Sequence, residues 1–587
     1  MRLLSGNEAV ALGALRAGAA AAFGYPGTPS TEVLETLSKI GGGSLYCEWS
    51  PNEKVALEAA AGASMAGART LTTMKLVGLN VAADPLMTLS YLGVQGGMVV
   101  LVADDPGQHS SQTEQDTRHY ARLAKVPILE PADAKEACAV MFRAFEISEK
   151  YRCPVIVRTT TCVSHSRCFV EEPEQLERKA VRFEKDVTRW IPIPLWGRKK
   201  RVHVEERMKL QAEEASADET WNRILPGNDR TFGIISSGVT ALYCRERFPD
   251  HPILKLTWSF PFPDELLRRF AKMTDRLFVI EEGDPVLEEH IKSLGIPCIG
   301  KDPVPRCGEL TPDRIEEVKN RILGKDPAPP ADIPESSDLP GRPPVLCAGC
   351  PHRALFYRLS RFRDIIVCGD IGCYSLGVFP PLNCTDTMLC MGGGFTVAHG
   401  IAKSGESRKT VGIVGDSTFF HSGITGLLDV VYNRGNSLLI VADNRSTAMT
   451  GHQDHPGTGV TLQGETTSAV SIEAVAKACG MERVYVCDPF DAEEMQRILK
   501  AELVRMDSPA LLVSRAPCPL HQKKRGVVRV VDPDLCKGCG ACLKCGCPAI
   551  GTADGKHPLI DPTACGGCML CESICRFSAI RPGKTGQ

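Results

Sequence analysis

The chain has 587 residues, which corresponds to about four domains at ~150 residues per domain. Its 68 basic and 70 acidic residues leave a net charge of −2, which gives no support to binding of nucleic acid or an anionic membrane through bulk charge. Residues 1–8 lack the apolar region of a signal peptide, and no apolar run reaches ~18 residues. We therefore expect a cytoplasmic protein without a membrane span.

In chain order, Ala-rich helical stretches alternate with short β-branched strands. Strands are expected at residues 98–102 and 155–157, then at 232–235 and 276–280, and finally at 365–367, 411–414, 438–441 and 511–513. This alternation predicts three α/β domains with mainly parallel sheets. We place them at residues 1–185, 229–323 and 345–525, with a charged excursion at 186–228, a linker with seven prolines at 324–344, and a cysteine-rich segment at 526–587.

Polar residues follow two neighbouring strands of the third α/β domain. Gly415, Asp416 and Ser417 end one strand, and Asn444 follows the next strand, 28 residues after Asp416. Carboxylate, amide and backbone carbonyl oxygens suit an octahedral Mg²⁺ site, although two ordinary polar strand ends are the alternative. The pair is similar to the thiamine-diphosphate motif. That resemblance implies that Asp416, Asn444 and the carbonyl of Ser446 bind the metal.

Two further segments are similar to parts of thiamine-diphosphate enzymes. Met391, followed by Gly392 and Gly393, matches the segment in which an apolar side chain supports the bent cofactor, with a core Met as the alternative. The Ala-rich helix start at residues 52–67 resembles the segment whose glutamate protonates the aminopyrimidine ring. Glu53 is the favoured glutamate there, with Glu48 and Glu58 as alternatives.

Most of the clustered cysteines lie at the C-terminal end of the chain, which has 26 in all. Two C-x2-C-x2-C runs, each followed by a further Cys, match bacterial two-cluster ferredoxins, in which the fourth ligand crosses to the other cluster. Zinc is the competing interpretation of a C-x2-C pair. The ferredoxin resemblance implies one [4Fe–4S] cluster on Cys536, Cys539, Cys542 and Cys575, and another on Cys565, Cys568, Cys571 and Cys547, with Cys545 as a substitute for Cys547.

With these motifs in place, the chain resembles the α subunits of indolepyruvate:ferredoxin oxidoreductases, within the 2-oxoacid:ferredoxin oxidoreductase family. The resemblance spans the chain, including Gly24-Tyr-Pro-Gly-Thr28 and Cys347-Ala-Gly-Cys350-Pro-His352-Arg. It implies a pyrimidine-binding domain at 1–185, a transketolase-C-like domain at 229–323, a diphosphate-binding domain at 345–525 and a two-cluster ferredoxin domain at 526–587.

The resemblance also implies the chemistry and the partners. Arylpyruvates, namely indolepyruvate, phenylpyruvate and 4-hydroxyphenylpyruvate, would react with CoA to give aryl-acetyl-CoA and CO2, and electrons would pass through the clusters to ferredoxin. Thr28 matches a position near the substrate carboxylate, although a helix cap is an equal alternative. A smaller β subunit is expected, in an α2β2 heterotetramer.

A third, proximal [4Fe–4S] cluster is expected outside the ferredoxin segment. Its candidate ligands are Cys347 and Cys350, the turn cysteine Cys373, which Cys368 could replace, and the distant Cys518. A structural zinc or unligated thiols are the alternatives. Three histidines near the diphosphate-binding loops could assist proton transfer: His421, His452 and His455.

Three other functions remain open at this stage. The chain could be a sibling oxidoreductase acting on another 2-oxoacid, because no pocket residue fixes the substrate side chain. It could be a non-oxidative thiamine-diphosphate decarboxylase with a regulatory ferredoxin module. It could also be an electron-transfer subunit that has lost thiamine.

Overall fold

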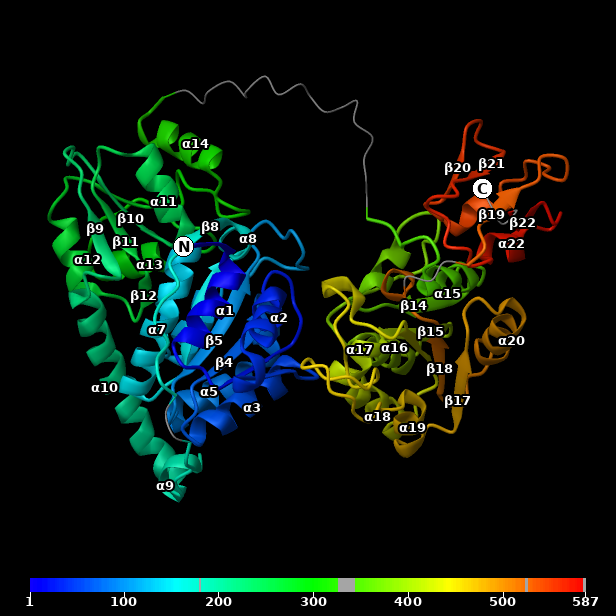
Figure 1. Cartoon of the computed structure of the whole chain (residues 1–587), viewed down its shortest axis with the longest axis horizontal. Coiled ribbons are helices and arrows are strands. Elements are labelled where there is room, and N and C mark those ends of the chain that lie inside the picture. Colours follow the sequence, from blue (N-terminus) through cyan, green and yellow to red (C-terminus); the bar gives the residue numbers. More distant parts are fainter. Residues whose placement is uncertain (179–180, 326–343, 523–525, 584–587) are drawn as a thin grey trace. The chain divides into compact units, whose positions relative to one another are not determined.

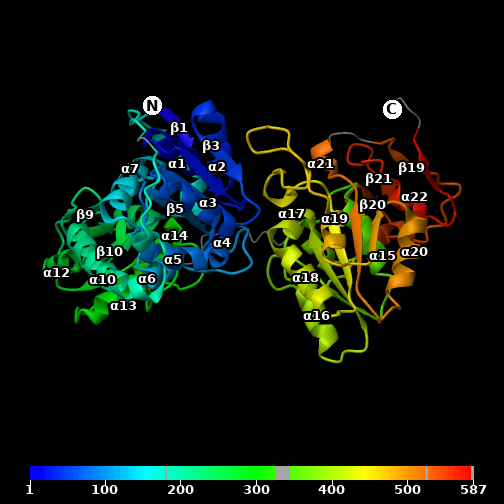
Figure 2. The same ribbon diagram turned by 90° about the horizontal axis from the view of Figure 1, so that it is seen from below.

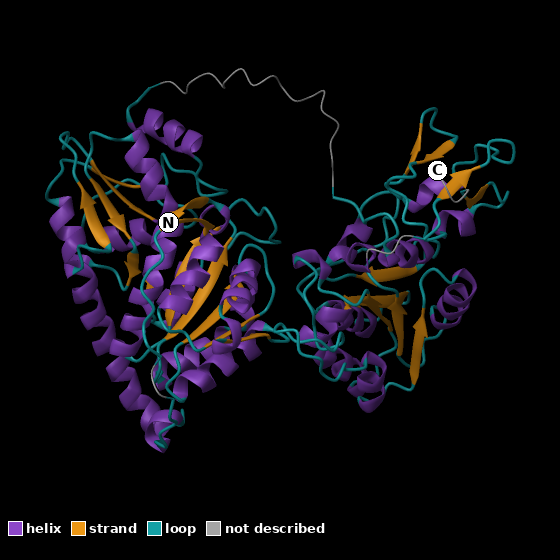
Figure 3. Cartoon of the chain, in the orientation of Figure 1, coloured by secondary structure: helices purple, strands orange, loops and turns teal. Residues whose placement is uncertain are grey.

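The computed structural model describes residues 1–178, 181–325, 344–522 and 526–583. The chain divides into two compact units, Met1–Ser336 and Ser337–Gln587. Both units are α/β, with helices packed against mainly parallel sheets, as the alternating pattern predicts (Figure 3). The expected linker at 324–344 lies mostly outside the described residues. No helix in the described ranges has both the length and the apolar composition that a membrane crossing requires.

The first unit is built on a seven-stranded sheet (Figure 1). All of its neighbouring strands run parallel except β6 and β12, the antiparallel pair at one edge of the sheet. In sheet order the strands are β12 (Trp258–Phe260), β6 (Ile128–Leu129), β7 (Val155–Thr160), β5 (Met98–Asp104), β4 (Thr70–Lys75), β2 (Ala21–Gly24) and β3 (Tyr46–Trp49). A separate antiparallel pair joins β1 (Arg2–Ser5) to β8 (Arg167–Val170).

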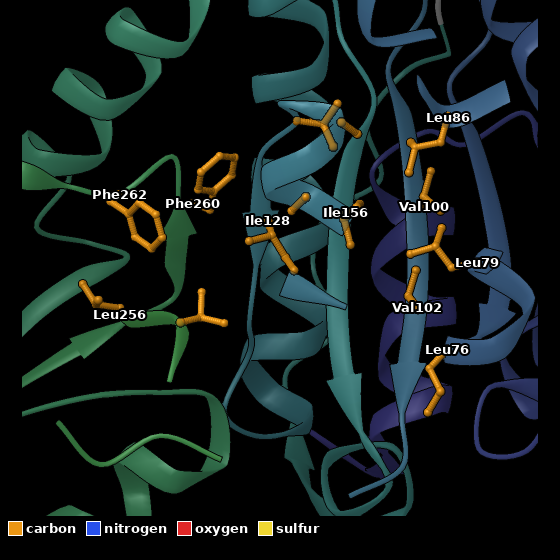
Figure 4. Close-up of a cluster of buried hydrophobic side chains, with 14 of the residues drawn as sticks. Leu76, Leu79, Leu86, Val100, Val102, Ile128, Ile156, Leu256, Phe260 and Phe262 are labelled. Carbon is orange, nitrogen blue, oxygen red and sulfur yellow. The ribbon is translucent and has the colours of Figure 1, made fainter. Parts of the chain in front are cut away.

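Helices cover both faces of this sheet because its strands are apolar on both sides. Val100 and Val102 of β5 pack with Leu79 and Leu86, which lie on helices of one face (Figure 4). Side chains alternate along a strand, so the equally buried residues between them point to the opposite face. The helices are α1 (Gly6–Arg16), α2 (Thr31–Ile40), α3 (Glu53–Met65), α4 (Leu76–Val81), α5 (Ala83–Leu92), α6 (Arg118–Ala124), α7 (Ala134–Tyr151) and α8 (Thr161–His165).

A four-stranded sheet completes the first unit. Its order is β13 (Leu277–Val279), β10 (Gly233–Ser237), β11 (Ile253–Leu256) and β9 (Asn222–Leu225), with β9 antiparallel. Its helices are α11 (Gly238–Arg247), α12 (Asp264–Ala271), α13 (Val286–Ser293) and α14 (Pro312–Ile322). The charged segment at 186–228 contains α9 (Val187–Trp190), the long helix α10 (Pro194–Ala217) and also β9. Strand pairing therefore crosses the domain boundaries expected from the sequence. Strand β9, from the charged segment, joins the four-stranded sheet, and β12, from the expected domain at 229–323, joins the seven-stranded sheet.

Buried ion pairs stabilise the first unit, and one of them joins its two sheets. The Arg158 guanidinium lies 2.6 Å from both the Asp104 and the Glu130 carboxylates. Arg118, which is 2 % exposed, contacts Asp116 and Glu281, and Glu281 follows a strand of the four-stranded sheet. Each of these charges has a partner within the low-dielectric interior, which is the condition under which buried ions are tolerated.

The second unit is built on a five-stranded, wholly parallel sheet. Its order is β14 (Ile365–Cys368), β15 (Lys409–Gly415), β16 (Leu438–Asp443), β18 (Ala510–Arg515) and β17 (Arg483–Cys487). Its helices include α15 (Pro351–Leu359), α16 (Gly394–Lys403), α17 (Asp416–Thr418), α18 (Ile424–Tyr432), α19 (Ile472–Ala478), α20 (Ala492–Glu502) and α21 (Pro519–Gln522).

The cysteine-rich segment packs against α15 of this second unit (Figure 2). Its described residues form two small antiparallel pairs, one short α-helix and a 3-10 helix at Ala541–Cys545. The pairs are β19 (Arg529–Val531) with β22 (Ile580–Pro582) and β20 (Ile550–Thr552) with β21 (Pro558–Ile560), and the α-helix is α22 (Leu570–Ile574). Buried Ala354 of α15 lies in one apolar cluster with Cys545 and Leu570, so the segment shares a core with the sheet domain.

Candidate functional site

The carboxyl ends of β15 and β16 bring the predicted metal-binding residues together. The Ser446 amide donates to the Asp416 carboxylate at 3.2 Å and to the Asn444 side-chain oxygen at 3.2 Å. All three residues are buried, and the Ser446 hydroxyl has no hydrogen-bond partner within the described part of the chain. This meeting follows from the parallel sheet, since the loops after neighbouring strands lie at the same edge. The oxygen-rich donor set fits a hard cation such as Mg²⁺.

Two buried histidines contact the predicted metal-binding residues. His455 Nε2 is 3.0 Å from the Asp416 carboxylate, and His352 Nε2 is 3.3 Å from the Asn444 side-chain nitrogen. Burial lowers the pKa of His352 to about 4, so this imidazole is neutral at pH 7. Of the three histidines considered from the sequence, His455 is at the site. The ring of His452 lies 5.8 Å from that of His521.

The electrostatics of the site also suit a cation. Burial, and then the neighbouring Asp416 charge, raise the pKa of Asp443. Burial alone would raise the pKa of Asp416, but His455 and hydrogen bonds hold it below its usual value. Two buried carboxyl groups thus lie close together. Arg515 pairs with Asp443 at 2.5 Å, and a divalent ion at Asp416 would reduce the repulsion that remains.

Asp370, which sequence reasoning did not single out as functional, organises the glycine segment after Met391. Its carboxylate accepts the backbone amides of Gly392 at 2.8 Å and Gly394 at 3.3 Å. Burial raises the pKa of Asp370 to about 7, although these amides oppose that shift. Gly392 has φ +85°, and a Cβ there would lie 2.0 Å from the Ser422 hydroxyl, so only glycine fits. The signal available in the sequence was the Gly369-Asp370 pair directly after a strand, with a second glycine at Gly372.

The other predicted cofactor-binding residues, Met391, Gly393 and Ser417, lie in the segments that follow strands of the five-stranded sheet. Met391 is half-buried, and its carbonyl accepts the Ser422 hydroxyl at 3.0 Å. The Ser422 hydroxyl also lies 2.9 Å from Nδ1 of the buried His421. Gly393 precedes α16, which packs on β15, the strand that ends in Gly415. Ser417 donates its amide to Asp416 at 3.0 Å.

In the first unit, the two candidate catalytic residues lie at the carboxyl ends of neighbouring strands. Glu53 opens α3 and is 7 % exposed, and its carboxyl packs against Gly78, where a Cβ would lie 2.5 Å from Oε1. Thr28 is half-buried, and its carbonyl accepts the Ser110 hydroxyl at 3.2 Å. Of the alternative glutamates, Glu48 accepts the Tyr46 and Ser50 hydroxyls, whereas Glu58 is exposed.

The four cysteines predicted for a proximal cluster lie close to the Asp416 site. Burial, and then the Cys518 and Cys347 thiolates and Asp416, together raise the pKa of Cys373 to about 11. Burial and the Cys347 thiolate likewise raise the pKa of Cys350. The backbone amide of Cys518 donates to the Asn444 carbonyl at 2.9 Å.

Cys368, the alternative to Cys373, belongs to a different environment. It is fully buried in an apolar cluster with Ile366 and Ala398. Burial raises its pKa, and the other groups that affect it are Thr387 and Asp386 rather than thiols. Cys373 is therefore better placed than Cys368 to act with the other three candidate cysteines.

The first ferredoxin-type cysteine set lines one cavity. Its walls are apolar apart from the cysteine sulfurs and one lysine, as suits a cluster shielded from water. The cavity residues are Val531, Cys536, Lys537, Cys539, Gly540, Ala541, Cys542, Pro558, Cys575, Phe577, Ala579 and Ile580. The predicted set of Cys536, Cys539, Cys542 and Cys575 is thus brought together by the fold, with Cys575 arriving from the distant second run.

The second cysteine set gathers as well, and both candidates for its fourth position lie beside it. Burial, and then the neighbouring Cys545, Cys568, Cys547 and Cys565, together raise the pKa of Cys571 to about 12. Cys545 is 1 % exposed and its thiol points to the Cys542 carbonyl at 3.1 Å. Among the described residues, no three His, Cys, Asp or Glu side chains converge on one point as a single-ion site.

Comparison with known proteins agrees with this arrangement. Residues 12–217 match the family described as pyruvate flavodoxin/ferredoxin oxidoreductase, thiamine diP-bdg, and residues 370–514 match the thiamine pyrophosphate enzyme C-terminal TPP-binding domain. The chain is 42 % identical to the indolepyruvate oxidoreductase subunit IorA of Methanothermobacter marburgensis, covering 99 % of this chain and 97 % of that protein. It is 40 % identical to the Pyrococcus horikoshii subunit of the same name, covering 100 % and 97 %.

A more distant relative matches only part of the chain. The 2-oxoglutarate synthase subunit KorA of Archaeoglobus fulgidus is 28 % identical over 48 % of this chain and 88 % of its own length. Identity of about 40 % across nearly the whole length, together with two thiamine-diphosphate-binding regions, decides the assignment. The chain is an oxidoreductase α subunit of the thiamine-diphosphate-dependent 2-oxoacid:ferredoxin class, and it belongs to the family of indolepyruvate oxidoreductase subunits IorA.

Proposed function

We propose that the chain catalyses the oxidative decarboxylation of arylpyruvates with CoA, giving aryl-acetyl-CoA and CO2. The two electrons released would pass through iron–sulfur clusters to ferredoxin. The observation that carries this proposal is the hydrogen bond from Cys518 to Asn444, at 2.9 Å. It joins a candidate cluster ligand to a candidate metal ligand, so a redox centre would stand beside the site of decarboxylation.

Asp416, Asn444 and the Ser446 carbonyl would hold Mg²⁺ and thereby the diphosphate of the cofactor. Their burial and oxygen-rich chemistry support this role. Thiamine diphosphate, when bound, supplies a carbon nucleophile for the ketone and an acceptor for the electrons freed by loss of CO2. His455 would orient the Asp416 carboxylate, as outer residues commonly do for metal ligands.

Glu53 would hold the proton at the aminopyrimidine ring. Its carboxyl is buried at a helix start, packed against a glycine that leaves room for it. Such a carboxyl can exchange a proton with a ring nitrogen while it is shielded from water. Met391 would support the bent cofactor from its half-buried position, and Thr28 would contact the substrate.

The candidate cysteine sets would form a path for electrons within the second unit. Gly349, between Cys347 and Cys350, approaches the ferredoxin segment so closely that a Cβ there would lie 4.0 Å from Cys568 Cβ. The buried Arg353 guanidinium donates to carbonyls of both segments, including that of Cys545 at 3.0 Å. These contacts would fix the separation between a proximal cluster and the cluster on the second ferredoxin-type cysteine set. The cluster on the first set would be the next along the path.

We further propose that the chain acts in the cytoplasm with a smaller β subunit, in an α2β2 heterotetramer that reduces ferredoxin. The family name, which describes one subunit of an oxidoreductase, supports a partner chain. The balanced near-zero charge gives no reason to expect nucleic acid or an anionic membrane among the partners.

The test is a screen of 2-oxoacids with CoA and oxidised ferredoxin, using the anaerobically purified chain with its β subunit. We expect kcat/KM for indolepyruvate and phenylpyruvate to exceed that for pyruvate by about tenfold or more, since an aryl ring buries extra apolar surface. A larger value for pyruvate or 2-oxoglutarate would assign a sibling activity. Aldehyde and CO2 without ferredoxin reduction would indicate a non-oxidative decarboxylase.

A further inference from the structure

Lys75 is a buried cation at the carboxyl end of β4, between the strands that lead to Thr28 and to Asp105. Its ammonium donates to the Ser110 carbonyl at 2.9 Å and to the Ser110 hydroxyl at 3.1 Å. Ser110 itself is exposed, so the lysine stem is buried while its charged end reaches an accessible loop. In the part of the chain that the structure describes, the ammonium forms no ion pair with a carboxylate.

The fold brings this ammonium beside the candidate substrate residue. The Ser110 hydroxyl that accepts from Lys75 also lies 3.2 Å from the Thr28 carbonyl. Gly27, next to Thr28, packs on the lysine stem: a Cβ there would lie 3.0 Å from Lys75 Cβ. Within the described ranges, the Thr28 hydroxyl takes part in no hydrogen bond, and it remains available to a ligand.

The nearest carboxylate is engaged elsewhere. Asp105 accepts the Ser110 amide at 2.8 Å, the Ser111 hydroxyl at 2.6 Å and the Thr161 hydroxyl at 2.8 Å. Burial would raise the pKa of Asp105, but these hydrogen bonds and Lys75 hold it below its usual value, so it is charged at pH 7. Asp105 thus shapes the Ser110 loop with neutral donors and leaves the ammonium with Ser110 as its partner rather than a carboxylate.

An anion that binds beside Thr28 needs a cation nearby, because two acidic groups lie in the same region. Asp105 is charged, and the Glu53 carboxyl lies against Gly78, three residues beyond Lys75. Without Lys75, a substrate carboxylate would approach two acidic groups in a poorly solvated region, which is strongly unfavourable. One ammonium with two hydroxyls matches a single carboxylate, whereas a diphosphate needs a metal ion or several donors.

We propose that Lys75 binds the carboxylate of the 2-oxoacid substrate, together with the hydroxyls of Thr28 and Ser110. The assignment rests on the proposed decarboxylase function, and it extends that function by naming the group that selects for a carboxylate. The rival role is purely structural, in which Lys75 only anchors the loop that carries Ser110.

The experiment compares ligands with and without the charge. Dissociation constants for phenylpyruvate and its carboxamide, and for pyruvate and its carboxamide, are measured on the chain with its β subunit and clusters but without thiamine diphosphate, so that the acids bind without losing CO2. We expect Lys75→Met to weaken binding of the acids by about tenfold to a hundredfold, the usual effect of losing a charge-assisted hydrogen bond. Binding of the amides should change by less than about twofold. Lys75→Arg should restore preference for the acids.

Lys54→Met is the matched control, because Lys54 is an exposed lysine of α3 that pairs with Glu58. A purely structural role would weaken acids and amides equally in Lys75→Met, and that result overturns the proposal. Should that variant not fold, the wild-type protein still decides. Its preference for acids over amides should fade above about pH 9, where a buried lysine is neutral, and persistence there overturns the proposal.

The pyruvate pair separates this inference from the proposed function. If pyruvate binds better than phenylpyruvate but still loses affinity in Lys75→Met, the arylpyruvate assignment fails while the role of Lys75 stands. If phenylpyruvate is preferred but Lys75→Met keeps the wild-type ratio of acid to amide, the arylpyruvate assignment stands while the role of Lys75 fails.

Discussion

The Asp416→Ala substitution tests the metal site most directly. The Asp416 carboxylate accepts hydrogen bonds from His455 at 3.0 Å, Ser446 at 3.2 Å and Ser417 at 3.0 Å. Bonds to a charged acceptor contribute about 1.5–3 kcal/mol each, but burial of this charge beside Asp443 offsets part of that. For the cofactor-free protein we therefore expect a modest loss of stability, about 1–3 kcal/mol.

The cofactor should respond much more strongly than the fold. At 100 to 1,000 times its dissociation constant, a ligand stabilises a protein by about 3–4 kcal/mol. For a domain of the size of the second unit, that corresponds to a Tm increase of about 6–16 °C. We expect Mg²⁺ and thiamine diphosphate to produce this increase in the wild-type protein and almost none in Asp416→Ala.

The assay is calorimetric unfolding with and without Mg²⁺ and thiamine diphosphate, combined with thiamine and iron analysis after gel filtration. The iron held by the two ferredoxin-type cysteine sets should be unchanged, since those cysteines lie outside this site. Asp429→Ala is the control, because Asp429 is an exposed carboxylate of the same unit that contacts Asn433. An Asp416→Ala protein that keeps its thiamine and the wild-type Tm increase would refute the metal assignment.

Three further predictions concern the first unit. Arg158→Met should destabilise it by about 3–5 kcal/mol, because Asp104 and Glu130 would remain buried without their cation; denaturant unfolding measures this, and a loss under about 1 kcal/mol contradicts it. Glu53→Gln should lower kcat by about a hundredfold or more while thiamine content stays unchanged, and wild-type turnover would exclude Glu53 as the proton carrier. Burial lowers the pKa of Lys75 to about 8, so kcat/KM for the 2-oxoacid should fall as pH rises above that value. Lys75→Arg should remove this alkaline limb, and a flat wild-type profile would contradict the reasoning.

Local sequence patterns were sufficient to predict much of the fold and the grouping of the motif residues. Asp416, Asn444 and Ser446 follow neighbouring parallel strands, so the sheet itself places them together. The set around Cys536 likewise combines near and distant cysteines as the two-run spacing implies. Both predictions depend on geometry that short segments fix, namely the direction of strands and the spacing of ligands.

Tertiary contacts decided the features that sequence reasoning missed. Lys75 is a single lysine at the end of an apolar strand, and nothing in its own segment shows that Ser110, 35 residues later, will meet its ammonium. Asp370 depends in the same way on the amides of Gly392 and Gly394. The pairing of β12 with β6 is equally non-local, because an antiparallel partner from a later domain can supply a sheet edge without any signal in either strand.

The pairing of β12 with β6 limits how the first unit can be divided. Trp258 of β12 is fully buried, with the Arg143 guanidinium 5.5 Å from the centre of its ring. A fragment that stops before residue 222 would leave β6 as an open, apolar sheet edge, which is a template for aggregation. The two sheets should therefore unfold in one transition, and gene fusions or deletions that preserve activity should keep residues 1–325 together as a single module.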